Sequence, residues 1–96
     1  MNYTFKENQL DYETYYILRK SVKWNNWSRE QAEIALGNSY YTVTVFDNKV
    51  PIGMGRAVGD GIYFMIMDIV VKPEYQRMGI GSTIIHMLLE HIEKNM

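Results

Sequence analysis

The chain contains no cysteine and is nearly neutral, with 10 basic residues, 11 acidic residues and a formal net charge of −1. The absence of cysteine excludes a disulfide framework and a cysteine nucleophile, and it favours a cytoplasmic location. The near-neutral charge argues against binding to nucleic acid or to an anionic membrane by bulk electrostatics. We therefore expect neither of these as a partner.

Long apolar runs are also lacking, so we expect no membrane-spanning segment. The first residues include Lys6, Glu7 and Asp11, which a signal peptide would not carry. What remains is a chain of 96 residues that is 47% hydrophobic and 22% charged, which is typical of a globular protein. This length predicts one domain over residues 1–96.

The apolar patterns predict the element order β-α-α-β-β-β-α. The expected strands lie at residues 2–6, 40–46, 52–58 and 62–71, and the expected helices at about 11–23, 28–37 and from 80 onward. Asp11 is expected to cap the first helix, and Ser28 with Gln31 forms a capping box for the second. The glycines of the third strand, at positions 53, 55 and 59, indicate a bulge or a close backbone approach.

The most informative segment is Gln76–Ser82, which reads Gln-Arg-Met-Gly-Ile-Gly-Ser and joins the strand 62–71 to the last helix. The first N–H groups of a helix lack intrahelical partners and lie at the positive end of its dipole. Gly79 and Gly81 have no Cβ that would keep a phosphate away from these groups. The segment predicts an anion site; the alternative is a plain strand-to-helix turn.

Two common phosphate-binding motifs do not fit this segment. A P-loop ends in Gly-Lys-Ser/Thr, whereas this loop ends Gly81-Ser82-Thr83 and has no lysine. A dinucleotide fingerprint places glycines directly after the strand and a third glycine or alanine at position 84, which is isoleucine here. A nucleotide-binding domain of another fold therefore needs glycines that this chain lacks.

The pattern that does match is Gln/Arg-x-x-Gly-x-Gly/Ala, met by Gln76, Gly79 and Gly81. It follows a strand that ends in Asp-Ile-Val-Val-Lys-Pro-Glu-Tyr, residues 68–75. In this register the segment closely resembles the acetyl-CoA-binding segment of the GNAT superfamily of N-acetyltransferases, and the resemblance in element order covers nearly all 96 residues. It implies an α/β (α+β) fold in which helices flank a mixed, mostly antiparallel sheet.

The resemblance also implies an activity and a cofactor. GNAT enzymes are acyl-CoA N-acyltransferases, which transfer an acetyl group from acetyl-CoA to a primary amine of a small molecule or a peptide N-terminus. The amine attacks the thioester directly in a ternary complex, and no metal takes part. The alternative is a non-catalytic module that binds acyl-CoA or another protein.

The family's cofactor-binding positions fall on the strand end and the loop. The resemblance implies that the backbone of Ile69, Val70 and Val71 binds the pantetheine amides. It implies that the loop backbone wraps the pyrophosphate, through Arg77, Met78, Gly79, Ile80, Gly81 and Ser82. Gln76 is expected to brace the start of the loop. The side chain of Arg77 either contacts a phosphate or is solvated at the surface.

The remaining candidate residues each have a structural alternative. Asp68 is the one carboxylate within the apolar strand 62–71; it is a candidate base or amine anchor, or a structural hydrogen-bonding residue. Trp24 and Trp27 either wall an acceptor pocket, which the first two helices line in the GNAT family, or pack in the core or against a helix. A five-residue step places His86 and His91 about 140° apart on a helix, so we expect no metal site there.

The resemblance implies more chain than the sequence contains. A GNAT domain continues after this helix with a further strand and helix and usually a closing strand pair, whereas the sequence stops at Met96. The strand 62–71 is then expected to present an open apolar edge, which natural proteins avoid. We therefore expect a C-terminally truncated domain, either as a fragment of a longer protein or with a homodimer covering the edge.

Overall fold

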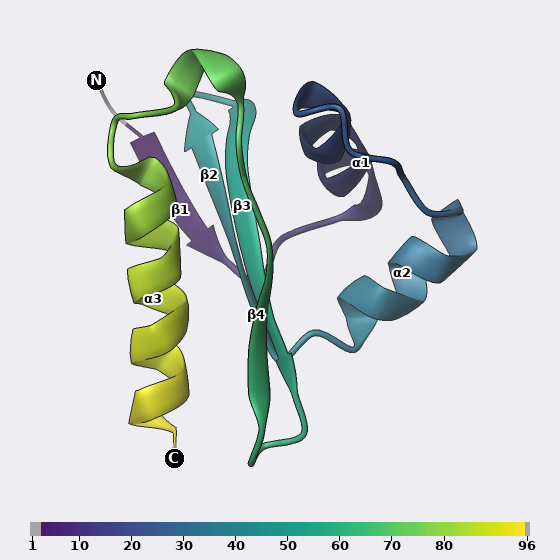
Figure 1. The fold of residues 1–96 in the computed structure, drawn as a ribbon, viewed down its shortest axis with the longest axis vertical. Coiled ribbons are helices and arrows are strands. Elements are labelled where there is room, and N and C mark those ends of the chain that lie inside the picture. The colour runs from purple at the N-terminus through teal and green to yellow at the C-terminus, as the bar shows by residue number, and fades with distance from the viewer. Residues whose placement is uncertain (1–2, 96) are drawn as a thin grey trace.

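The computed structural model describes residues 3–95 and is a four-stranded sheet with helices on both faces (Figure 1). The strands are β1 (Tyr3–Glu7), β2 (Tyr41–Asp47), β3 (Val50–Gly59) and β4 (Phe64–Val71). The helices are α1 (Tyr12–Ser21), α2 (Arg29–Gly37), the short 3-10 helix η1 (Pro73–Tyr75) and α3 (Ile80–Lys94). The predicted element order is confirmed. Residue 2, expected in the first strand, lies outside the described residues.

The sheet has the order β1-β2-β3-β4, and every neighbouring pair is antiparallel. The helix α3 covers one face of the sheet, whereas α1 and α2 lie on the other face (Figure 1). The predicted α+β class is therefore confirmed. In the part of the chain that the structure describes, β4 is an edge strand, and the predicted homodimer would cover this edge. The homodimer stays a prediction, which light scattering can check.

The helix starts follow the predicted caps. The Asp11 carboxylate accepts a hydrogen bond from the Thr14 N–H at 2.9 Å. The Ser28 hydroxyl accepts one from the Gln31 N–H at 3.2 Å and donates one to the Gln31 side chain at 3.1 Å. These caps satisfy N–H groups that have no partner inside the helix, which is why the two helices begin where the sequence predicts.

Each face of the sheet has its own core cluster. The apolar residues of α3 recur at three- and four-residue steps and are buried against the sheet: Ile80, Ile84, Leu88 and Ile92. On the opposite face, Tyr15 and Leu18 of α1 pack with Met54 of β3 and Val70 of β4. The strands β3 and β4 therefore lie between two layers of helices.

The predicted bulge is confirmed: Ile52 is an extra residue in β3 where it pairs with β2, and a second bulge places an extra residue in β4. The register shifts between Met54 and Arg56, where the single residue Gly55 faces two residues of β4. Asp68 adopts a left-handed backbone there, with φ of 56°. The bulge lets Ile66 and Ile69, three residues apart, both pack against the α3 cluster. Asp68 is left on the opposite face, beside α1.

Two predicted strand starts are wrong: β3 begins at Val50 rather than at residue 52, and β4 begins at Phe64 rather than at Ile62. The Asp60 carboxylate accepts hydrogen bonds from the N–H groups of Ile62 and Tyr63, both at 2.9 Å. These bonds form a local turn that competes with strand pairing, so the two residues stay exposed despite their high strand propensity.

Candidate functional site

Two side-chain hydrogen bonds, both from residues at the C-terminal end of η1, hold the loop after β4. The Gln76 side-chain amide donates to the Val71 carbonyl at 2.9 Å, so the predicted bracing of the loop start is confirmed. The Tyr75 hydroxyl donates to the Asp47 carboxylate at the end of β2, at 2.7 Å. This bond raises the pKa of Tyr75, which keeps the phenol in its donating form. The loop therefore has a fixed starting point next to the sheet.

The glycine-rich segment leads into α3, whose first N–H groups donate no hydrogen bond to a capping side chain. Gly79 is the N-cap of α3 and has φ of 83°, a conformation that glycine adopts without strain. The first N–H that donates at this end is that of Thr83, which lies 3.0 Å from the Gly79 carbonyl. Among the described residues, the N–H groups of residues 80–82 have no acceptor. They are available to an anion.

A hollow of about 340 Å³ lies against these N–H groups. Its lining is Val71, Tyr75, Gln76, Arg77, Gly79, Ile80, Gly81 and Ser82. A Cβ placed on Gly81 would lie 3.7 Å from Val71 Cγ2 and would meet no other nearby atom. The space beside Gly81 is therefore open, and the arrangement suits a phosphate approaching the positive end of α3.

The structure brings most of the predicted cofactor positions together. Val71 and the loop positions other than Met78 line the hollow, whereas the Met78 sulfur lies 3.5 Å from the Tyr3 hydroxyl. Ile69 and Val70 lie further back along β4, on its α3 and α1 faces respectively. The cofactor-binding roles of all these residues stay predictions.

Asp68 lies at the centre of a second cluster, on the α1 face of the sheet. Its Oδ1 accepts from Arg19 Nη1 at 2.6 Å, and its Oδ2 accepts from Arg56 Nε at 2.8 Å and from the Tyr15 hydroxyl at 3.0 Å. The three charged side chains are between 8% and 12% exposed. The cost of burying the carboxylate is therefore offset by two ion pairs.

Further hydrogen bonds fix the two arginines. Arg19 donates through Nε and Nη2 to the Asn25 carbonyl, in the segment between α1 and α2. Arg56 donates through Nη1 to the Ser39 hydroxyl at 3.1 Å. Burial and the neighbouring carboxylate of Asp68 raise the pKa of Tyr15, so its phenol is neutral at physiological pH. The cluster thus ties α1, the segment between α1 and α2, and the segment between α2 and β2 to β3 and β4.

Sequence reasoning missed the roles of Arg19, Arg56 and Tyr15. One signal was available: Arg56 lies inside the apolar strand β3, and a buried arginine needs a carboxylate partner. The contacts of Asp68 favour its structural alternative, because both oxygens are engaged and accepting a proton would weaken two ion pairs. Its catalytic role stays a prediction.

The two tryptophans do not pack in the core. Trp27 is 58% exposed and Trp24 is 43% exposed, so neither is a core residue. Trp27 lines a cavity of about 320 Å³ together with Asp68 and its partners. The Arg19 guanidinium lies over the ring of Trp24, with its Cζ 5.2 Å from the ring centre. The segment between α1 and α2 therefore forms one wall of the Asp68 cavity.

Comparison with known proteins identifies the family. The family model described as Acetyltransferase (GNAT) family matches residues 3–95. The chain belongs to the GNAT acetyltransferase family. A solved structure from meticillin-resistant Staphylococcus aureus, titled a probable acetyltransferase, is 35% identical and superposes with a TM-score of 0.90. That match covers 97% of this chain and 71% of the other.

Other members of the GNAT family are similar at greater distance. An uncharacterized N-acetyltransferase, ycf52, of Pyropia yezoensis is 30% identical over 79 residues, which are 77% of this chain and 45% of the relative. This chain thus spans about half the length of the curated relatives it matches. The PaiA N-acetyltransferase of Thermoplasma acidophilum, solved with coenzyme A, is 17% identical with a TM-score of 0.76. That match covers 98% of this chain and 74% of the other, and it shows the shared fold.

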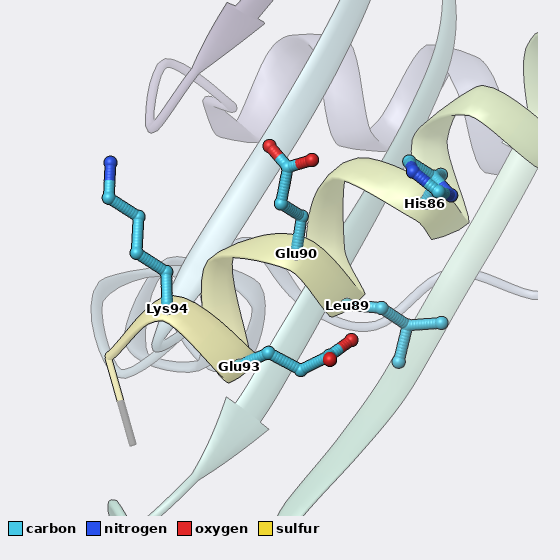
Figure 2. Close-up of a pocket in the computed structure, with 5 residues that line it drawn as sticks. All are labelled: His86, Leu89, Glu90, Glu93 and Lys94. Carbon is cyan, nitrogen blue, oxygen red and sulfur yellow. The ribbon is translucent and has the colours of Figure 1, made fainter.

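Another hollow of this GNAT chain, of about 620 Å³, lies along α3. Figure 2 shows its lining residues, which project separately from one helix: His86, Leu89, Glu90, Glu93 and Lys94. The ring of His91 stacks instead on Tyr41, at 3.8 Å between ring centres. Across residues 3–95, no group of three or more His, Asp or Glu side chains is placed to hold a metal. No helix within that range is long and apolar enough to cross a membrane.

Proposed function

We propose that this chain forms the acetyl-CoA-binding part of an N-acetyltransferase that acts on a primary amine. The observation that carries the proposal is the open hollow at the start of α3, where free N–H groups and a left-handed Gly79 lie against β4. Membership of the acetyltransferase family supports acetyl transfer as the reaction. The presence of coenzyme A in the PaiA structure supports the choice of cofactor.

In this proposal the cofactor is bound mainly by backbone groups. The N–H groups of residues 77–82 hold the pyrophosphate. Those of residues 80–82 lie at the positive end of the α3 dipole and have no acceptor among the described residues. The backbone of Ile69, Val70 and Val71 binds the pantetheine amides along β4. Arg77 adds one solvated contact to a phosphate.

The proposed reaction is a direct attack. The neutral amine of the acceptor forms a C–N bond to the acetyl carbonyl, the C–S bond breaks, and CoA leaves as the thiolate. The proton lost by the amine passes to a base or to water. We assign Asp68 to positioning rather than to this proton transfer, because both of its carboxylate oxygens already accept hydrogen bonds from Arg19, Arg56 and Tyr15.

Two measurements on the 96-residue chain test the proposal. Calorimetry with CoA is expected to show binding, and the absence of binding would contradict the proposed cofactor site. Release of free thiol from acetyl-CoA, measured with a panel of primary amines, tests the transferase activity. CoA binding without thiol release from any amine would favour the non-catalytic alternative that the sequence left open.

A further inference from the structure

The cavity beside Asp68 has the size and the walls of a small-molecule site. Its volume of about 320 Å³ lies at the lower end of the range of ligand pockets. The lining combines apolar surface from Trp27 and Met67 with polar groups of Arg56 and Asp68. The walls come from α1, the segment between α1 and α2, α2, β3 and the β4 bulge. The cavity is distinct from the hollow at the start of α3, since the two have no lining residue in common.

The charged groups of this cavity do not balance. The ion pairs of Arg19 and Arg56 both end on Asp68, so two guanidinium groups meet one carboxylate. Tyr15 adds no negative charge, because burial and Asp68 raise the pKa of its phenol. The nearest acidic residue along α1, Glu13, is paired with the exposed Arg29 instead. One positive charge is left over in a site where the charged side chains are about nine-tenths buried.

Arg56 also has donor capacity to spare. Its Nε donates to Asp68, and its Nη1 donates to Ser39 and to the Ala35 carbonyl. Among the described residues no acceptor faces its Nη2, whereas all three guanidinium nitrogens of Arg19 have acceptors. A guanidinium with a free N–H in a low-dielectric cavity is well suited to bind a carboxylate.

We propose that the Asp68 cavity binds the carboxylate of the acceptor, so that the amine substrate is one that also carries a carboxylate. The proposal rests on the proposed transferase function and adds the chemical class of its substrate. One unbalanced positive charge matches a monoanionic carboxylate better than a dianionic phosphate. Met67 and Asp68 directly precede residues 69–71, so a ligand held here has its amine near the strand assigned to pantetheine.

The test compares ligands that differ only in the carboxylate. Glycine, β-alanine and 4-aminobutyrate are titrated against their uncharged amides, with the fluorescence of the tryptophans as readout, since Trp27 lines the cavity. We expect the best acid to bind about tenfold more tightly than its amide, the usual effect of one charge-assisted hydrogen bond. Equal binding of acids and amides would overturn the proposal.

Two substitutions with opposite expected effects separate binding from loss of the fold. Arg56→Gln should abolish the preference for the acid, whereas Asp68→Asn should strengthen acid binding, because it raises the excess charge from one to two. Arg56→Lys, which keeps the charge, should retain part of the preference. Unchanged acid affinity in both Arg56→Gln and Asp68→Asn would overturn the proposal, and circular dichroism checks that each variant is folded.

The control is Arg29→Gln, which removes the same charge from an exposed pair with Glu13 and Glu33. It should leave the preference for acids intact. CoA is titrated in parallel, so that the two proposals fail separately. A protein that binds CoA but does not distinguish acids from amides loses only the present inference. A protein that prefers acids but does not bind CoA loses only the cofactor assignment.

Discussion

The loop at the start of α3 and the Asp68 cluster are built in opposite ways. The loop site consists of neighbouring residues, 75–82, and offers mainly backbone N–H groups. The Asp68 cluster joins side chains of α1, β3 and β4 that are up to 53 residues apart in sequence. A site made of contiguous backbone can be identified from a short motif, whereas one assembled from distant side chains requires the fold.

The two regions also differ in what a substitution should do. The hollow beside Gly81 is open, so a small side chain there fills space without displacing protein atoms. The Asp68 cluster is buried and fully paired through its carboxylate, so losing one member leaves charges unpaired. Substitutions in the loop should therefore change CoA binding without lowering stability, whereas those in the cluster should lower stability in addition to changing the proposed acid binding.

The largest expected effect is that of Asp68→Ala on stability. The substitution leaves two buried arginines without a carboxylate, and removing one partner of a buried pair typically costs about 3–5 kcal/mol. Unfolding in urea should show this loss. The control Glu13→Ala breaks only an exposed pair and should cost about 1 kcal/mol or less. Similar losses in the two variants would contradict the difference drawn between buried and exposed pairs.

Tyr15→Phe should have a smaller effect that depends on pH. At neutral pH it removes one hydrogen bond to Asp68, worth about 1–2 kcal/mol. The folded pKa of Tyr15 is raised above 10.0, so its stabilising contribution is complete below pH 10 and is lost as the pH rises through the folded pKa. The stability difference between wild type and Tyr15→Phe should therefore shrink above pH 10.

Urea unfolding at pH 7 to 11 measures this difference. Tyr63→Phe serves as the control, because its side chain is 78% exposed. A difference between wild type and Tyr15→Phe that stays constant up to pH 11 would show that the Tyr15 phenol is not held in its neutral form by the cluster.

The parts of the fold that the sequence predicts correctly depend on local signals. The caps at Asp11 and Ser28 and the periodicity of α3 act within a few residues, and all three are confirmed. The predicted start of β4 is wrong because the Asp60 carboxylate accepts hydrogen bonds from two N–H groups. These bonds compete with strand pairing, and strand propensity does not include them. The ion pairs of Asp68 were missed because no local pattern specifies which arginine reaches it.

The smallest expected effect is that of Arg77→Ala on CoA binding. Arg77 is exposed and offers the cofactor one partly solvated contact, so its loss should cost roughly 1 kcal/mol or less. Calorimetry with CoA measures this change. A loss of CoA binding as large as that expected for Gly81→Val would show that the Arg77 side chain, rather than the backbone, dominates the site.

The central claim, that backbone groups beside Gly81 bind the pyrophosphate of CoA, is tested most directly by calorimetry on Gly81→Val. The Cβ that this substitution adds would meet only Val71 Cγ2, at 3.7 Å, so the protein should stay folded. Gly37→Val, at another glycine with open space, is the matched control. The account predicts that Gly81→Val abolishes CoA binding while Gly37→Val retains it. CoA binding by Gly81→Val with wild-type affinity would contradict it.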